Sequence, residues 1–299
     1  MNRDSKTAPT WSIKTLKSPV DGLKIRYGVR EMTGDPVHRI LLLNGRSEWI
    51  EKYADLPDAT RYGENALWVS MDHRGQGASE GKRAHVKSYD DFARDVAAVV
   101  TKTFGDKPYI IVAHSMGGLI ATYGTLKGIL DPKGLVLCAP LFGLLIPMPY
   151  RLAKLIALVL TLSPFGGIAT GAGVDRRKAF KDNPLTQSKK RFEAMTGGPY
   201  QASTPTFAWV HATFLATALI YEKKYLKKLT IPVSLIVGEK EAVVDRLVYQ
   251  AWIDKREKLT GQATRFKLVP GALHELLNES DKYRKSAISF INQAIKKQV

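Results

Sequence analysis

The sequence of 299 residues is poor in cysteine and has no long apolar run. Cys138 is its single cysteine, so no disulfide can form within the chain, and a reducing compartment such as the cytoplasm is predicted. No run of about 18 uncharged apolar residues is present, so no membrane-spanning helix is expected. Residues 1–17 are polar and lack the apolar segment of a secretory signal, so no such leader is expected.

Acidic residues are scarce relative to basic ones. The chain has 28 Asp and Glu against 45 Lys and Arg, which gives a net charge of +17 and a pI near 9.8. Such a balance favours contact with an anionic surface, whether lipid, nucleic acid or an acidic partner. No nucleic-acid motif accompanies the charge, and acids are interspersed among the basic residues of the expected helices. Nucleic acid is therefore not predicted as a partner, and no obligate protein partner is inferred.

Two further classes of site are excluded by residue spacing. The six histidines and one cysteine show no metal-ligand spacing, so no metal site is expected, and nothing in the sequence requires a cofactor. Residues 75–82 read G-Q-G-A-S-E-G-K, with glycines ahead of a lysine as in a phosphate-binding loop. The glycines are wrongly spaced for that loop, and Arg83 stands where Ser or Thr is required, so a nucleotide site is not predicted.

What the sequence does contain is an alternation of strand-like and helix-like segments. It predicts a mostly parallel, doubly wound sheet of seven or eight strands. The expected strands are residues 23–31, 38–44, 66–71, 109–113, 134–139, 233–237 and 265–269. The expected helices are residues 48–62, 89–104, 119–127, 246–258 and 281–297.

Residues 141–203 interrupt this alternation. The segment is rich in Leu, Gly, Pro and basic residues and has helical patches at 151–162 and 189–195. We interpret it as a cap inserted between two parts of one core, residues 1–140 and 204–299. A helix over residues 204–219 is expected to return the chain to the core. The cap would lie over the carboxyl edge of the sheet.

The segment 109–118, Y-I-I-V-A-H-S-M-G-G, predicts a buried strand, a sharp corner and the start of a helix. This is the setting of a nucleophile elbow, with Ser115 at the strained corner. Gly117 supplies one of the small residues that the turn requires, and Ala113 stands at the other small position. The N–H of Met116 and the helix N-terminus would stabilise an oxyanion.

A serine nucleophile needs a base and an orienting acid. His274 follows the last expected strand, in a loop that opens at the same sheet edge as Ser115, and is the candidate base. Glu241 lies in the loop beyond strand 233–237 and is the candidate acid. Asp245 remains the alternative acid, although it stands directly before a helix, where aspartate is a favoured N-cap.

The second oxyanion donor is expected after an early strand. Residues 41–48 read L-L-L-N-G-R-S-E, and Gly45 permits a close backbone approach. The N–H of Arg46 can then face the site. The order Ser, acid, His along the chain is the order that α/β hydrolases use.

These motifs resemble the α/β-hydrolase family, in particular bacterial lysophospholipases and monoacylglycerol lipases. The resemblance rests on L-L-L-N-G-R-S-E, D-H-R-G-Q-G-A-S-E-G, A-H-S-M-G-G, the segment around Glu241 and G-A-L-H-E, with support from 183–191 and 205–212. It implies that D-H-R-G-Q-G is structural and braces the active-site loops. The chain departs from the family pattern at three positions: Asn44, where histidine is frequent; Ala113, where glycine stands; and Glu241, where many members have aspartate.

The resemblance implies a serine carboxylic-ester hydrolase that cleaves lysophospholipids or monoacylglycerols. A general small-ester esterase and a catalytically silent binding protein of the same fold are the alternatives. Residues 141–162 are strongly apolar, and residues 141–230 hold 13 Lys and Arg against 4 Asp and Glu. Apolar surface beside clustered cations predicts peripheral contact with an anionic membrane, such as its cytoplasmic face. Arg176, Arg177 and Lys178 are candidate contacts for a phosphate head group.

Overall fold

The computed structural model describes residues 11–30, 32, 34–171, 179–200 and 204–298. Within these residues eight strands form one sheet in the order β1-β2-β4-β3-β5-β6-β7-β8. Strands β1 and β2 run antiparallel at one edge, and the pairs from β4 to β8 are parallel. The strands are β1 (Trp11–Lys17), β2 (Lys24–Arg30), β3 (His38–Leu43), β4 (Ala66–Met71), β5 (Ile110–His114), β6 (Gly134–Cys138), β7 (Val233–Gly238) and β8 (Thr264–Val269).

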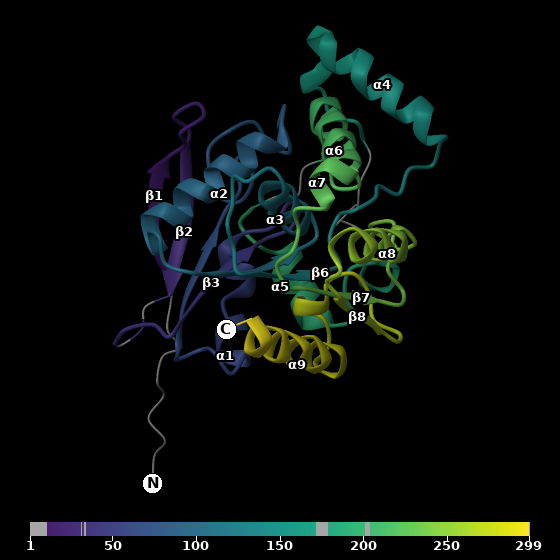
Figure 1. Cartoon of the computed structure of the whole chain (residues 1–299). Helices are drawn as coiled ribbons and strands as arrows, with labels where there is room; N and C mark the ends of the chain where they lie inside the picture. The colour runs from purple at the N-terminus through teal and green to yellow at the C-terminus, as the bar shows by residue number, and fades with distance from the viewer. Residues whose placement is uncertain (1–10, 31, 33, 172–178, 201–203, 299) are drawn as a thin grey trace.

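Helices cover both faces of this sheet (Figure 1). One face packs against α2 (Tyr89–Phe104), α3 (Met116–Leu126), α6 (Phe207–Leu219) and α8 (Val248–Thr260). The other face packs against η1 (Ile50–Tyr53), α1 (Leu56–Ala59) and α9 (Asp281–Gln298). The short elements α7 (Lys223–Leu226) and η4 (Leu276–Asn278) complete the core. Strands β5 and β6 are buried along their whole length, as a parallel strand covered on both faces must be.

One predicted helix was wrong, and one strand was missed. Residues 48–62 form two short helices, η1 and α1, because Pro57 stands in the first turn of α1 and lacks the N–H that a continuous helix needs. Helices α3, α6 and α8 are present as predicted, but they begin at Met116, Phe207 and Val248 rather than at 119, 204 and about 246. Strand β1 lies in a segment that the sequence marks as polar, because an edge strand leaves much of its length exposed.

The cap segment contains α4 (Tyr150–Leu162), η2 (Pro164–Gly167), η3 (Phe180–Asp182) and α5 (Lys189–Thr196). Helix α4 lies at the top of the molecule in Figure 1 and buries Ala153 and Ala157 against Phe214 of α6. The opposite face of α6 packs into the main core through Trp209 and other residues. Helix α6 therefore belongs to both layers, and the proposed boundary at residue 203 falls just before it.

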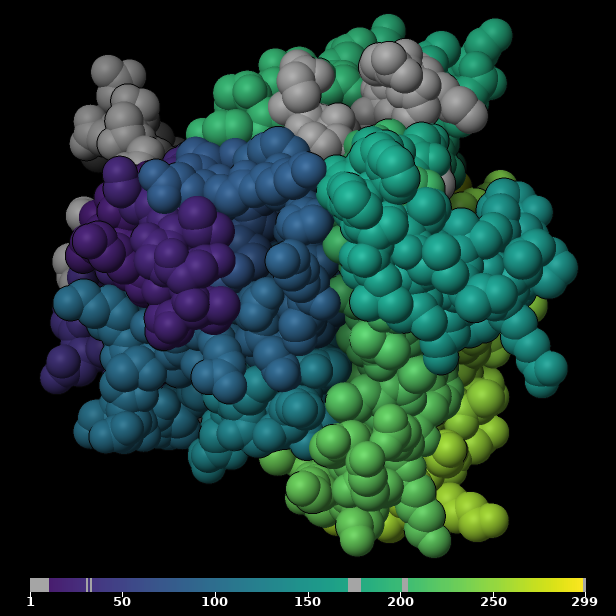
Figure 2. Space-filling view, turned by 90° about the horizontal axis from the view of Figure 1, so that it is seen from above, coloured from purple at the N-terminus to yellow at the C-terminus, as the bar shows by residue number. Residues whose placement is uncertain are grey.

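Most of α4 does not pack against the core. Seen from above, the teal atoms of the segment around α4 form part of the outer surface (Figure 2). Leu162 is 81% exposed, and several other large apolar side chains of the cap are exposed: Leu145, Met148, Tyr150, Leu152, Leu155, Ile156, Leu158, Val159, Phe165 and Ile168. None of the described helices combines the length and the hydropathy needed to cross a bilayer.

Candidate active site

Ser115 stands at the junction of β5 and α3, and its backbone is strained. Its φ is +50° and its ψ is −117°, in a region that side-chain-bearing residues rarely adopt. The next turn passes very close to β3: a Cβ on Gly117 would lie 2.5 Å from the carbonyl oxygen of Leu43 and 2.6 Å from that of Asn44. Glycine is therefore required at 117. This is the geometry of a nucleophile elbow.

His274 and Glu241 form a buried pair. The Nδ1 atom of His274 donates a hydrogen bond to Oε2 of Glu241 at 2.6 Å, which leaves Nε2 to accept a proton. The other oxygen of Glu241 accepts from the N–H groups of Val243, at 2.7 Å, and Val244, at 3.2 Å. These bonds hold the carboxylate in one orientation. A buried acid that orients the histidine through Nδ1 is what a serine hydrolase requires.

Asp245, the alternative acid, has a different environment. Its Oδ1 accepts a hydrogen bond from the N–H of Leu247 at 3.0 Å, and the residue is partly exposed. The N-cap position of α8 is Leu247 itself, so Asp245 closes the turn that leads into the helix instead of capping it. The structure thus pairs His274 with Glu241 and places Asp245 outside that pair.

Burial and charge act in opposite directions on the two groups of the pair. Burial alone would lower the pKa of His274, but the charge and hydrogen bond of Glu241, with the nearby charges of Glu275 and Glu48, raise it above the ordinary histidine value. Burial alone would raise the pKa of Glu241, but His274 and the two backbone N–H groups lower it. The pair therefore favours an ionised acid beside a strongly basic imidazole, which suits a general base.

His114 directly precedes Ser115 in the sequence, but its side chain contacts His274 and Glu48. Its ring packs against that of His274, with centroids 4.8 Å apart, and its Nδ1 lies 3.2 Å from a carboxylate oxygen of Glu48. Tyr53 donates to the same carboxylate at 2.9 Å. His114 thus supports the back of the histidine loop.

A buried charge cluster that the sequence analysis missed lies behind the site. Lys52 Nζ is 2.6 Å from Glu48 and 2.8 Å from Glu275, and all three side chains are at most 2% exposed. The N–H of Gly45 donates to Glu48, and Glu275 follows His274 directly. The bridge through Lys52 therefore ties the candidate oxyanion loop to the histidine loop. The i, i+4 spacing of Glu48 and Lys52 was a usable signal.

Residues 72–77, D-H-R-G-Q-G, also hold the candidate oxyanion loop in place. His73 Nε2 donates to the carbonyl of Asn44 at 3.1 Å, and Gln76 accepts from the N–H of Ser47, whose φ is +60°. Burial lowers the pKa of His73 to about 4, so this ring is neutral. Asp72 accepts from the N–H of Ile50 at 2.9 Å. These contacts give the segment the bracing role that the family resemblance implies.

The N–H groups expected to bind an oxyanion belong to Met116 and Arg46, which line the same pocket as Ser115. Met116 is the first residue of α3, a position whose N–H has no partner within the helix. Arg46 follows Gly45, whose close approach to Glu48 and His114 leaves no room for an unstrained Cβ. Arg46, Met116, Ser115 and His274 all line one pocket.

This pocket has a volume of about 770 Å³, in the range of small-molecule sites. The cap supplies much of its apolar wall, together with α6 and the loop after Glu241. The apolar lining residues are Met116, Leu141, Leu144, Leu145, Ile146, Pro147, Met148, Ala153, Ile156, Ala157, Pro184, Leu185, Pro205, Phe207, Trp209, Val210, Ala242, Val243 and Val244. Such a wall fits an acyl chain.

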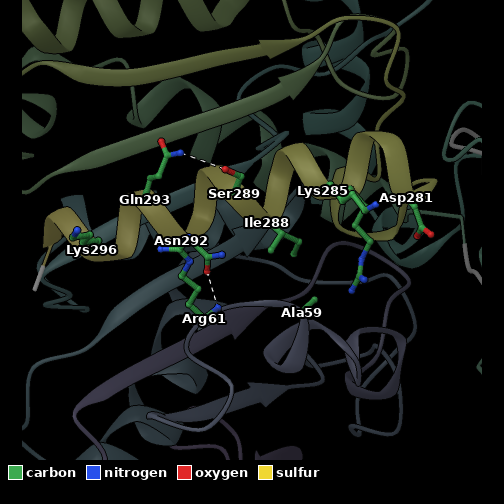
Figure 3. A pocket seen from close by; sticks show the side chains of 10 residues that line it. Ala59, Arg61, Asp281, Lys285, Ile288, Ser289, Asn292, Gln293 and Lys296 are labelled. Atoms are coloured by element: carbon green, nitrogen blue, oxygen red, sulfur yellow. Dashed lines mark hydrogen bonds between the residues drawn. The ribbon is translucent and has the colours of Figure 1, made fainter.

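A second pocket, of about 570 Å³, lies along α9 and has a different character (Figure 3). Its sides carry polar and charged side chains, including Arg61, Lys285 and Lys296, and Asn292 accepts from the N–H of Arg61 at 3.0 Å. It contains neither Ser115 nor a histidine. Among the described residues no group of three or more His, Cys, Asp or Glu side chains is placed to hold a metal ion.

The family model described as serine aminopeptidase, S33, matches residues 34–281. The chain belongs to this family. A probable lysophospholipase L2 of Haemophilus influenzae is 30% identical to this hydrolase over 267 residues, which cover 85% of the chain and 82% of that protein. A monoacylglycerol lipase of Mycolicibacterium smegmatis is 26% identical, with 88% of the chain and 90% of that protein covered.

A solved structure extends this comparison to the fold. It is a soluble variant of monoglyceride lipase from Saccharomyces cerevisiae in complex with a substrate analog. It is 21% identical to this S33-family hydrolase, with a TM-score of 0.79, over 100% of this chain and 97% of that one. The predicted family and the predicted α/β-hydrolase fold are confirmed, and the chain is a hydrolase.

The two candidate acids can be separated by substitution. Glu241→Gln keeps the shape of the side chain but removes the charge that stabilises the His274 imidazolium, so kcat should fall by about 10³- to 10⁴-fold. Asp245→Asn keeps an oxygen that accepts from Leu247, so kcat should stay within about twofold. Ester hydrolysis by the two purified variants measures this. A large loss in Asp245→Asn with little loss in Glu241→Gln would transfer the role to Asp245.

The charges around His274 predict a shift in the pH profile. His274 must be neutral to act as a base, so kcat/KM falls as the pH drops through its pKa. Glu275 raises that pKa, so Glu275→Gln should move the acidic limb of the profile to lower pH. Glu239→Gln is the control, because Glu239 is exposed and not among the groups that raise the pKa of His274. An acidic limb that stays in place or moves upward in Glu275→Gln would contradict the assignment.

Proposed function

We propose that this S33-family hydrolase cleaves the acyl ester of single-chain lipids, lysophospholipids or monoacylglycerols, by a Ser115–His274–Glu241 triad. The observation that carries the proposal is the strained Ser115 in the wall of a largely apolar pocket that His274 also lines. The hydrogen bond between His274 and Glu241 completes the arrangement. The relatives named lysophospholipase L2 and monoacylglycerol lipase support the substrate class.

In this mechanism Ser115 Oγ attacks the ester carbonyl while His274 Nε2 takes the hydroxyl proton. Glu241 stabilises the imidazolium, and the N–H groups of Met116 and Arg46 bind the oxyanion. The tetrahedral intermediate expels the glycerol oxygen, which takes the proton from His274. Water, deprotonated by His274, then attacks the acyl-enzyme and releases the fatty acid. When the second tetrahedral intermediate collapses, Ser115 Oγ leaves and takes the proton back from His274, so the complete cycle restores both residues.

The surface of the cap supports the hypothesis that the enzyme meets its substrate at a membrane. The exposed apolar residues of α4 lie beside Arg151 and Lys154 in the sequence. Other cap residues line the pocket that would hold the acyl chain. Apolar side chains flanked by cations bind anionic bilayers by burial and charge together. We infer peripheral attachment through α4, at the cytoplasmic face. Arg176, Arg177 and Lys178 lie outside the described residues, so their contact with a head group stays a prediction.

Substrate preference and vesicle binding test the proposal together. Wild-type enzyme should hydrolyse a long single-chain lipid with a higher kcat/KM than p-nitrophenyl acetate, because only the former fills the apolar pocket. Ser115→Ala should lose activity by several orders of magnitude and, since it does not consume lipid, serve for sedimentation. It should sediment with vesicles containing phosphatidylglycerol, less so at high salt, and poorly with phosphatidylcholine vesicles.

Matched leucines supply the control for the membrane contact. Leu162, in α4, and Leu247, before α8, are both highly exposed. In the Ser115→Ala background, Leu162→Glu should weaken sedimentation and Leu247→Glu should not. Equal effects of the two substitutions would remove α4 as the contact. A preference of the wild type for short soluble esters would replace the lipid assignment with a small-ester esterase.

A further inference from the structure

The pocket along α9 contains no residue of the candidate triad and has no part in ester cleavage. It lies between one side of α9 and the turn after α1, which supplies Arg61 (Figure 3). We call it the α9 groove. Among the described residues its basic lining residues are Arg61, Arg284, Lys285 and Lys296, and its acidic lining residue is Asp281. The α9 groove therefore carries a net positive charge.

Three of these basic side chains have no counter-charge. The fourth, Arg284, donates a hydrogen bond to Asp55 at 2.9 Å and forms an ion pair with it. In the part of the chain that the structure describes, the side chains of Arg61, Lys285 and Lys296 form no hydrogen bond or ion pair. All three residues are exposed to solvent. They are therefore available to pair with an anionic ligand.

The dipole of α9 accounts for only one of the three. Lys296 lies in the last turn of the helix, where a cation is favourable. Lys285 lies near the opposite end, where the dipole gives no reason for a cation. Asp281 precedes Lys285 by four residues, a spacing that permits an ion pair, yet these two described residues form none. An anionic ligand would supply the missing counter-charge.

The three cations form a row along the helix. Lys285 and Lys296 lie about 16 Å apart along the axis, at about 1.5 Å of rise per residue. Arg61 lies between them, because its backbone N–H donates to Asn292 at 3.0 Å. An extended peptide rises about 3.3 Å per residue, so about five residues span this row, and alternate side chains point to the same face. A short acidic segment in extended form therefore matches the row.

Two other anionic partners fit the α9 groove less well. Helix α4, which the proposed function places at a bilayer, lies at the top of the molecule in Figure 1, and α9 lies at the bottom. A flat bilayer in contact with α4 therefore does not reach the α9 groove. Single-stranded nucleic acid binds through base stacking on aromatic side chains, and no aromatic residue is found among the described lining residues. An acidic protein segment needs neither.

We propose that the α9 groove binds an acidic, extended segment of a partner protein. Arg61, Lys285 and Lys296 pair with carboxylates of the segment, at an interaction surface separate from the triad. Charge complementarity of this kind speeds association and selects the partner, and it is weakened by salt.

The probe is a fluorescein-labelled peptide of alternating Glu and Ser residues, and its binding to the full chain is measured by fluorescence anisotropy. Wild-type protein should bind it at low salt, release it as salt is added, and not bind the matched peptide with Gln in place of Glu. Lys285→Glu combined with Lys296→Glu should weaken binding by about tenfold or more, because two attractive charges become repulsive.

Another helix supplies the control for the overall charge of the chain. Arg94 and Lys102 are exposed on α2, which covers the opposite face of the sheet. Arg94→Glu combined with Lys102→Glu makes the same change in net charge and should leave binding within about twofold of wild type. Thermal unfolding should be alike in the two double variants, since all four residues are exposed.

The outcomes do not depend on ester cleavage, so failure here is distinguishable from failure of the proposed function. A wild-type protein that does not bind the acidic peptide would overturn the proposal. An equal loss of binding in the two double variants would do the same, because general charge would then explain it. If a thymidine oligonucleotide or phosphatidylglycerol vesicles bind more tightly than the peptide, and the α9 substitutions abolish that binding, the acidic segment is the wrong partner.

Discussion

The tight turn at Ser115 is the constraint on which the site depends. A non-glycine residue in this conformation costs about 1–3 kcal/mol and persists only where its surroundings impose it. Here the N–H of Ser115 donates to Cys138 of β6 at 3.0 Å, and its carbonyl accepts from Leu141 at 2.9 Å. Gly117 lets β3 approach from the other side. Two neighbouring strands thus hold the serine at the carboxyl edge of the sheet.

The ion pairs of Lys52 with Glu48 and Glu275 hold the loops around Ser115 by charge. Lys52 joins a carboxylate of the loop after β3 to a carboxylate of the loop after β8, on the two sides of Ser115. Removing one partner from such a buried network leaves an uncompensated charge, which typically costs about 3–5 kcal/mol. The same carboxylates raise the pKa of His274. One cluster therefore positions both loops and tunes the base between them.

How much the sequence predicts depends on how local each signal is. The elbow, Gly45 and the strand that ends before Glu241 are short motifs, and the structure has them where they were expected. The partnership of Glu241 with His274, and not Asp245, needed coordinates, because one turn of chain separates the two acids in sequence. Strand β1 was missed because an edge strand stays largely exposed, and its pairing with β2 leaves no signal in the composition.

The bridge from Lys52 to Glu275 and the contact of Arg46 with Trp209 could not be predicted from the sequence for the same reason. Each depends on a partner from a distant segment: Glu275 for Lys52, and Trp209 for Arg46. Periodicity and spacing report neighbours along one element and carry no information on such contacts. The buried network and the Arg46–Trp209 contact follow from tertiary packing.

The proposed mechanism requires Ser115 to form an acyl-enzyme, and covalent labelling of the serine tests this requirement. The enzyme is incubated with a long-chain alkyl fluorophosphonate, digested, and analysed by peptide mass spectrometry. We expect one phosphonyl group per chain, on Ser115, with loss of activity in proportion to labelling, and no labelling of Glu241→Gln on the same time scale. A chain that stays unlabelled while it hydrolyses ester, or that is labelled at another residue, would contradict it.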